Sequence, residues 1–269
     1  MPILTDEQIQ EAAKRFDEAE RTRRQVRPLT FDFPEIDMAD AHAVQDAWVA
    51  MKLARGARIR GRKIGLTSKA MQRAMNIGEP DYGTLLDDMF FHDGAEIETA
   101  SFLDPRVEVE ISFVLQDSLQ GTEVSVDQVL DATEAVYPSL ELIAARSYRI
   151  DPESGKTRTV VDTIADNAAS AGVVLGTRGF DPREVDLPWC GAALYRNGEV
   201  EETGLAAAVM GHPAHGVCWL ARRFAVHGIA LTPGDVILSG SFTRPVAARA
   251  GDCFLADFGP LGRIGCRFV

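Results

Sequence analysis

The chain has 269 residues, of which 46% are hydrophobic and 25% are charged, as in ordinary globular proteins. Its formal net charge of −12 argues against nucleic acid or an anionic membrane as a partner, although a local cation could receive a small anionic substrate. The four cysteines form no Cys-x-x-Cys motif, and no apolar run approaches the roughly 18 residues of a membrane helix. We therefore expect a reduced, cytoplasmic protein without disulfides or structural zinc.

The N-terminal part of the chain has helical patterns. Residues 5–25 show apolar side chains at helical spacing with dense charge between them, which predicts an amphipathic helix. A second helix is predicted over residues 39–55 and ends at Gly56. The connecting segment RPLTFDFPEI contains two prolines and is expected to be a loop.

The middle of the chain alternates strand and loop signals. Residues 59–68 predict a short strand that runs into a turn, and residues 79–94 are rich in Asp and Gly, as in a loop. Residues 106–115 have the period-2 alternation of a strand. Residues 124–136 have helical spacing, and the following YPSLELIAA predicts another strand, which carries Glu141.

The C-terminal part is rich in short strands. Asn197–Gly198 separates two extended runs within residues 185–204, a strong signal for a β-hairpin. Residues 212–228 begin with a proline suited to a first helical turn and end on glycine, so a helix is predicted there. Together the patterns predict one α+β domain, with a helical part over about residues 1–58 and a β-rich core over about residues 59–269.

The strand RVEVEISFVL raises a question about its two glutamates. Glu108 and Glu110 alternate with apolar residues and leave the same face of the strand, with about 6.6 Å between their α-carbons. Two neighbouring carboxylates repel each other unless water, a proton or a cation separates them. With Glu141 as a third carboxylate, the set suits a hard cation such as Mg²⁺ or Mn²⁺. The same residues also fit two exposed surface glutamates and one unrelated glutamate, and spacing alone leaves both interpretations open.

Two further residues are candidates for catalysis. Lys63 lies between Gly61 and Gly65, where it could meet an anionic substrate or simply extend into solvent from a strand end. Asp81 in EPDYG could act as a general acid or base, or only cap a turn. The same two interpretations apply to Asp87 and Asp88, which are weaker candidates for catalysis.

Other kinds of site lack their motifs. The five histidines have no metal-ligand spacing with the glutamates, and His212 and His215 at a predicted helix start are expected to be capping or surface residues. No GxGxxG, GxxxxGK[ST] or GxSxG motif occurs, which disfavours nucleotide cofactors and a serine hydrolase.

Essentially the whole chain resembles one group of enzymes. Six blocks of sequence are similar to those of the hydratases in the fumarylacetoacetase-like superfamily, in the order GRKIGLTSKAMQ, EPDYGTLLDDMFF, PRVEVEISFVL, LELIAAR, DTIADNAASAG and GSFTRPV. The resemblance implies a mixed β-roll core with an N-terminal helical part. It also implies a homo-oligomer that is dimer-based and could be pentameric or decameric.

The resemblance further implies a metal site and a reaction. Glu108, Glu110 and Glu141 match the ligands of an Mg²⁺ or Mn²⁺ ion, and Lys63 and Asp81 match catalytic residues. The implied reaction adds water to 2-oxo-hept-4-ene-1,7-dioate and gives 4-hydroxy-2-oxo-heptane-1,7-dioate, in the meta-cleavage catabolism of homoprotocatechuate. On this interpretation the glutamates face the metal and the alternating valines face the core.

A dicarboxylic substrate also needs contacts at its distal end. Arg244 in SFTRP is the first candidate, because arginine makes bidentate contacts with carboxylates, although it could equally pair with a surface acid. The further candidates for this role are Arg62, Arg106 and Arg146. Leu86 and Thr163 are expected to contact the substrate, and Asp162, Thr163 and Asn167 could add supporting hydrogen bonds.

Two rival functions remain open at this point. A decarboxylase of the 4-oxalocrotonate type would use the same metal and enolate chemistry, although the GSFTRPV and EPDYG blocks favour hydration. The chain could instead be a non-catalytic scaffold partner that keeps the fold, but the presence of Lys63, Asp81 and all three glutamates argues against a dead site.

Overall fold

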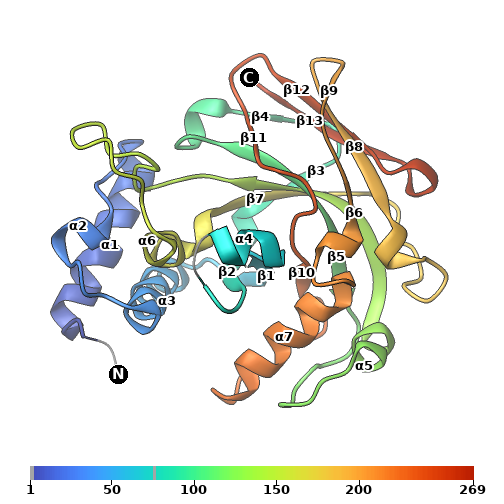
Figure 1. Cartoon of the computed structure of the whole chain (residues 1–269), viewed down its shortest axis with the longest axis horizontal. Helices are drawn as coiled ribbons and strands as arrows, with labels where there is room; N and C mark the ends of the chain where they lie inside the picture. The colour runs from blue at the N-terminus through green and yellow to red at the C-terminus, as the bar shows by residue number, and fades with distance from the viewer. Residues whose placement is uncertain (1–2, 75–76) are drawn as a thin grey trace.

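The computed structural model describes residues 3–74 and 77–269, and two β-sheets form its centre (Figure 1). The larger sheet has the strand order β2-β1-β10-β5-β6-β7-β3, with β11 pairing with β5. Its strands are β1 (Ile59–Gly65), β2 (Asp81–Leu86), β3 (Phe90–His92), β5 (Arg106–Leu115), β6 (Thr133–Ile143), β7 (Ser170–Leu175), β10 (Val236–Leu238) and β11 (Val246–Ala247). The smaller sheet has the order β4-β13-β12-β8-β9. Its strands are β4 (Ala95–Ile97), β8 (Gly191–Arg196), β9 (Glu199–Leu205), β12 (Cys253–Asp257) and β13 (Arg263–Phe268).

Both sheets are mixed. In the larger sheet β5 is antiparallel to β6 and β10, whereas β1 is parallel to β10. In the smaller sheet β13 is antiparallel to β12 and parallel to β4. The predicted α+β class, with a mixed β core and an N-terminal helical part, is confirmed.

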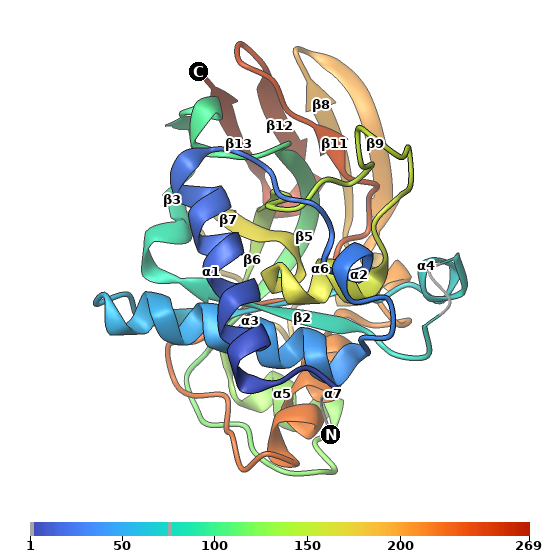
Figure 2. The same cartoon turned by 90° about the vertical axis from the view of Figure 1, so that its left-hand side faces the viewer.

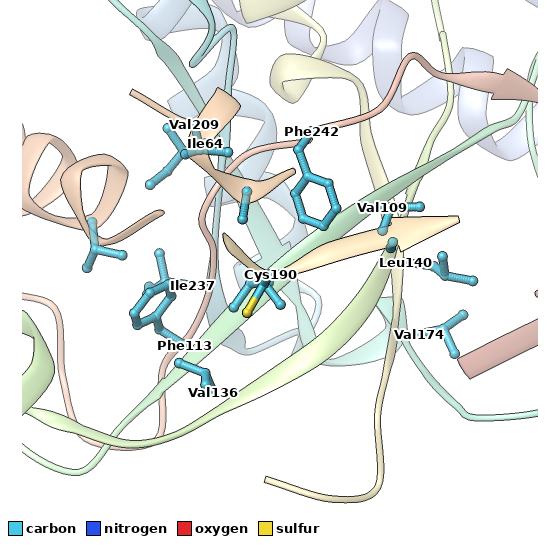
Figure 3. Close-up of a cluster of buried hydrophobic side chains, with 14 of the residues drawn as sticks. Ile64, Val109, Phe113, Val136, Leu140, Val174, Cys190, Val209, Ile237 and Phe242 are labelled. Carbon is cyan, nitrogen blue, oxygen red and sulfur yellow. The ribbon is translucent and has the colours of Figure 1, made fainter. Parts of the chain in front are cut away.

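The main hydrophobic core lies on one face of β5 and β6. Val107, Val109, Ile111 and Phe113 are fully buried there, as the period-2 alternation of β5 requires. Figure 3 shows Val109 and Phe113 among side chains from β6, β7 and β10. The opposite face of β5 is therefore the one that carries the glutamates.

The N-terminal helices pack on the larger sheet and share a second hydrophobic core with it. Helices α1 (Asp6–Thr22) and α3 (Met38–Ala54) begin at capping boxes formed by Thr5 and Asp37, and both fit the prediction. Phe16 and Trp48 are buried from these helices against β2, β7 and β10. Figure 2 shows α1, α3 and α6 (Val160–Ala165) gathered on this side.

Helix α2 (Leu29–Asp32) contacts α6 on the same side of the molecule, and α5 (Val126–Asp131) and α7 (Pro213–Ala225) contact each other. Helix α4 (Lys69–Ala74) follows β1. The His212 side chain accepts a hydrogen bond from Ala214 N at 3.0 Å and so caps α7, as predicted. Asn197 and Gly198 have φ angles of 56° and 87° between β8 and β9, which agrees with the predicted hairpin.

Several segments differ from the sequence-based expectations. The expected loop 79–94 contains strand β2, because residues 81–86 pair with β1. The helical spacing of residues 124–136 continues only to Asp131, because Thr133 already pairs with β5. Helix α6 was not anticipated, and the RPLTFDFPEI loop contains α2. In the described chain no helix is long and apolar enough to cross a membrane, and all four cysteines are free.

Candidate active site

Three glutamates share one face of the main sheet. Glu108 on β5 lies directly opposite Glu141 on β6, and Glu110 lies two residue pairs further along, opposite Ser139. All three glutamates line a cavity of about 660 Å³. The register of two antiparallel strands therefore brings Glu141 beside the pair that the sequence of β5 already placed together.

Two oxygen atoms of these carboxylates are buried and accept no hydrogen bond from the described residues. Glu110 Oε2 accepts a hydrogen bond from Gly240 N at 2.8 Å, but Glu110 Oε1 has no partner in the described chain. Glu141 Oε1 lies 3.2 Å from Lys63 Nζ in an ion pair that is not aligned as a hydrogen bond. Buried acceptors without partners are costly, so these oxygens are the atoms most suited to bind a ligand.

Burial raises the pKa of every glutamate in the cluster, and repulsion between the glutamates adds to this for Glu108 and Glu110. Burial and the charge of Glu141 raise the pKa of Glu108 to about 7. Burial and both other glutamates raise the pKa of Glu110 well above its ordinary value. Burial also raises the pKa of Glu141, although the ammonium of Lys63 opposes this effect. The face thus holds more negative charge than its surroundings neutralise.

The donor atoms of this face fit a hard divalent cation. Oxygen-only donors suit Mg²⁺ or Mn²⁺, and a cation would satisfy the unpaired carboxylate oxygens and relieve their repulsion. Among residues 3–74 and 77–269, however, no three acidic, His or Cys side chains are already gathered around one point. The three glutamates can therefore supply the ligands, but their side chains would have to turn toward the ion to do so.

Lys63 on β1 contacts this cluster from the neighbouring part of the sheet. Its side chain is buried, and its Nζ atom lies 3.2 Å from Glu141 Oε1. Burial alone would lower its pKa, but the charges of Glu141, Asp81 and the other glutamates outweigh burial and raise it. Lys63 is therefore a fixed positive charge beside the carboxylates, and the solvent-exposed alternative is wrong.

Asp81 at the start of β2 is the second buried candidate. It pairs with Gly65 of β1, and a side chain at Gly65 would place its Cβ 2.1 Å from Asp81 Oδ1. Only glycine at this position leaves room for the carboxyl group. Burial raises the pKa of Asp81, although Lys63 opposes this, and Asp81 Oδ1 has no hydrogen-bond partner in the described chain. Asp81 thus lines the cavity and is more than a turn cap.

A strained backbone segment forms another part of the cavity wall. Asn167, Ala168 and Ala169 all have positive φ angles, between 49° and 61°, which L-residues other than Asn and Asp rarely adopt. The buried side chain of Asn167 holds the segment in place. Its Oδ1 accepts from Thr84 N (2.8 Å) and Gln45 Nε2 (3.1 Å), and its Nδ2 donates to Thr84 O (2.9 Å). Helix α3, strand β2 and this turn are thereby joined behind the cavity.

The residues predicted to bind substrate lie in three different settings. Thr163 on α6 lines the cavity and donates to Thr159 O at 3.2 Å. Leu86 lies at the far end of β2 and is buried in the core against the N-terminal helices, so its side chain does not line the cavity. Arg244 lines the cavity rim, but its side chain is 83% exposed and lies 2.7 Å from Glu202. The surface ion pair considered as the alternative for Arg244 is therefore present.

Most of the other candidates lie elsewhere. Arg62 packs over the ring of Phe224, and Arg146 forms ion pairs with Glu20 and Asp166, both outside this cavity. Asp87 and Asp88 also lie outside it. Asp162 accepts hydrogen bonds from Thr30 and Thr159, and so supports α6 as anticipated.

Sequence reasoning did not single out two arginines of the cavity wall. Arg149 and Arg158 line the cavity from the loop that connects β6 to α6, where Arg158 N donates a hydrogen bond to Arg149 O at 2.9 Å. Arg106, one of the lesser candidates, lines it from β5. The only signal in the sequence was the repeated arginine in ARSYRID and KTRTV, which has no spacing rule to distinguish it from solvated charge.

Comparison with known proteins identifies the family. Residues 60–269 match the family model described as "Fumarylacetoacetate (FAA) hydrolase C-terminal". The chain belongs to the fumarylacetoacetate hydrolase family. Within this family it is 55% identical to the 2-oxo-hept-4-ene-1,7-dioate hydratase of Escherichia coli over 96% of both chains. It is also 39% identical to the 2-hydroxyhexa-2,4-dienoate hydratase of Comamonas testosteroni, over 99% of this chain and 100% of the relative.

A solved structure from the family has the same fold throughout. It is the 4-oxalocrotonate decarboxylase from Pseudomonas putida G7, complexed with magnesium and adipate. The TM-score is 0.94 at 35% identity, and the match covers 100% of both chains. The same decarboxylase has also been solved with calcium and acetate. The α+β fold predicted for a fumarylacetoacetase-like protein is thus confirmed over the full length of the chain.

Proposed function

We propose that this protein is a hydro-lyase that adds water to 2-oxo-hept-4-ene-1,7-dioate and yields 4-hydroxy-2-oxo-heptane-1,7-dioate. The observation that carries the proposal is the cavity that holds three glutamates, Lys63 and Asp81 together. It occurs in a chain that is 55% identical to a hydratase of that name over 96% of its length. A role in homoprotocatechuate catabolism follows from that substrate.

The metal-binding residues in this proposal are Glu108, Glu110 and Glu141. A bound Mg²⁺ or Mn²⁺ would act there as a Lewis acid toward the C1 carboxylate and the 2-oxo oxygen of the substrate. The raised pKa values of the three glutamates and their unpaired oxygens support this assignment. The magnesium in the related decarboxylase supports the choice of metal.

Lys63 and Asp81 have complementary roles in the proposed reaction. Lys63 holds the C1 carboxylate or the 2-oxygen of the substrate and stabilises the negative charge that develops on the enolate. The 2-hydroxy-2,4-diene form becomes a conjugated enone when C5 takes up a proton, and C4 is then the electrophilic carbon. Water adds at C4, and C3 takes up the second proton.

Asp81 moves these protons. Burial raises its pKa, which favours the protonated carboxyl that can give a proton to a substrate carbon. Once ionised, the same group can orient the attacking water or take its proton. Asp81 and Lys63 both line the cavity, so one substrate molecule can reach both.

A decarboxylase is the second candidate, because the solved relative with a TM-score of 0.94 is a 4-oxalocrotonate decarboxylase. That activity would use the same glutamates and Lys63 to stabilise the enolate formed when CO₂ leaves. The higher identity to the hydratase, 55% against 35%, favours hydration.

The proposal extends to the whole protein. We propose that residues 1–269 act as one catalytic domain, because the helices over about residues 1–58 share a hydrophobic core with the sheet that carries the site. The protein is further proposed to work in the cytoplasm as a homo-oligomer, dimer-based and of pentameric or decameric order. A small 2-oxo dicarboxylic acid is its partner, without nucleic acid or membrane.

The first test is a mass analysis of the product. The protein is incubated with 2-hydroxy-hepta-2,4-dienedioate and Mg²⁺, with an EDTA-treated sample as the control. A metal-dependent gain of one water supports the hydratase. Loss of CO₂ assigns the decarboxylase activity, and an unchanged substrate together with no thermal response to Mg²⁺ or oxalate supports a non-catalytic scaffold.

A further inference from the structure

Two arginines share a single carboxylate at the outer end of the glutamate face. Arg149 Nε lies 2.6 Å from Asp104 Oδ2, and Arg106 Nη2 lies 3.8 Å from the same oxygen. The Nε atom of Arg106 is buried and has no hydrogen-bond partner among the residues described. One aspartate cannot neutralise two guanidinium groups, so this corner of the cavity keeps an excess positive charge.

A third arginine, Arg158, adds to this positive charge, but its guanidinium group already has hydrogen-bond partners. Arg158 donates to Asp166 Oδ2 at 3.1 Å and to Ser147, which anchor it to the wall of the cavity. Burial and the charges of Arg158 and Arg106 lower the pKa of Arg149 to about 10. An anion placed beside Arg106 and Arg149 would remove this unfavourable crowding.

The position of Arg106 fits the length of a substrate bound at the glutamates. Arg106 precedes Glu108 by two residues on β5 and therefore lies on the same face, about 6.6 Å further along the strand. Both residues line one continuous cavity. A ligand whose 2-oxo acid end lies at the glutamates and whose carbon chain follows β5 would bring a terminal carboxylate to Arg106.

We propose that Arg106 and Arg149 form the subsite that binds the distal carboxylate of a dicarboxylic substrate. The proposal rests on the proposed function, which places the 2-oxo acid end at the glutamates. Arg106 supplies the unpaired Nε, and Arg149 supplies the second guanidinium. Asp104 keeps both side chains directed at the cavity.

Arg244, the residue expected from the sequence to bind this carboxylate, is less suited to it. Its side chain is 83% exposed, and both Nε and Nη2 lie within 2.9 Å of Glu202 Oε1. A carboxylate that bound there would have to displace an existing partner in a solvent-screened position. Arg106 and Arg149 are more buried and have fewer partners for their charge.

The test compares two unreactive ligands of equal chain length. The metal-loaded protein is titrated with 2-oxoheptanedioate and with 2-oxoheptanoate, which lacks the distal carboxylate, and the ratio of their Kd values is measured by calorimetry. Charge-assisted hydrogen bonds of this kind are expected to give a preference of about 10- to 100-fold for the dicarboxylate. Oxalate, which has no distal end, reports whether the metal-binding end is intact.

The variants Arg106→Met and Arg149→Met are expected to reduce this preference to less than about 3-fold and to bind oxalate as the wild type does. Arg183→Met is the matched control, because Arg183 pairs with Asp131 on the surface and lies outside the cavity. The proposal is overturned if both variants keep the wild-type ratio of Kd values for the two ligands. It is also overturned if the wild type does not prefer the dicarboxylate, or if only Arg244→Met loses that preference.

The outcomes separate this subsite from the proposed reaction. If the variants lose the preference but the wild type adds no water to the dienoate, the subsite stands and the hydratase proposal fails. If the wild type hydrates the dienoate but the variants keep the preference, the hydratase stands and the subsite proposal fails.

Discussion

Lys63 and Glu141 form a buried ion pair inside the cavity, with 3.2 Å between Nζ and Oε1. The pair joins β1 to β6, which are not neighbours in the sheet, across the face that also carries Glu108 and Glu110. Lys63 is thus the positive charge already present at a site that holds three carboxylates. This arrangement explains why the lysine remains charged.

Replacing Lys63 by methionine should abolish most of the activity. The variant keeps the length of the side chain but removes the charge that we propose stabilises the enolate, so turnover should fall by about 100-fold or more. Loss of one partner from a buried pair should also cost roughly 3 kcal/mol in the free energy of unfolding. Turnover and urea unfolding are measured beside Lys14→Met, which changes an exposed lysine of α1. Normal turnover in the Lys63 variant would refute its role.

Divalent metal should raise the melting temperature. At a metal concentration of 100 Kd, linkage adds about 2.7 kcal/mol to the stability, which corresponds to a shift of roughly 5 °C or more. EDTA should reverse the shift, and Glu108→Gln and Glu141→Gln should weaken it. Glu134→Gln is the matched control, because Glu134 is exposed on the same strand as Glu141. An equal shift in all three variants would show that the metal binds elsewhere.

Gly65→Ala should impair catalysis through Asp81. The new Cβ would lie 2.1 Å from Asp81 Oδ1, so the carboxyl group has to move away from its place in the cavity. A displacement of about 1 Å can cost roughly 100-fold in turnover. Gly78→Ala serves as the control, since a Cβ there meets no atom of the described residues within 4 Å. The prediction fails if both variants turn over substrate equally well.

Asn167 should stabilise the protein through its side chain as well as its backbone. Asn167→Gly keeps the left-handed conformation but loses the hydrogen bonds to Thr84 and Gln45, which should cost about 1–3 kcal/mol. Asn167→Ala should cost about 1 kcal/mol more, because alanine at a φ of 51° is strained. Urea unfolding of both variants separates the two effects. Equal stability of the glycine variant and the wild type would argue against a role for the hydrogen bonds.

Protonation of Glu20 should make the protein less stable in acid. Burial opposes its ionisation, but Arg146 and Lys52 outweigh burial and lower its pKa from 4.5 to about 2. A carboxyl group with a lowered folded-state pKa adds stability above its unfolded pKa and loses it as the pH falls. We therefore expect about 3 kcal/mol at pH 6 to disappear between about pH 4.5 and pH 2.

The check on Glu20 is the variant Glu20→Gln. Its free energy of unfolding should lie below that of the wild type at pH 6, and the two values should converge as the pH approaches 2. A difference that stays constant over this range would show that the charge of Glu20 contributes nothing to stability.

Local chemistry made much of the fold predictable from the sequence. The capping residues before α1 and α3, the Asn197–Gly198 turn and the proline at the start of α7 each act within a few residues. They could be assigned without knowledge of the rest of the chain. The helix predicted from the spacing of residues 124–136 was too long, because pairing with β5 overrides a weak helical preference at Thr133.

The sequence by itself determined that Glu108 and Glu110 share one face of β5 opposite the buried valines, because side chains alternate along any strand. Only the tertiary structure decided that Glu141 lies beside them, that Lys63 pairs with it and that Arg106 and Arg149 share Asp104. The tertiary structure also buries the side chain of Leu86 in the hydrophobic core against the N-terminal helices, and it leaves Arg244 exposed beside Glu202. These contacts depend on strand register and on packing between segments far apart in the chain, and no local pattern encodes them.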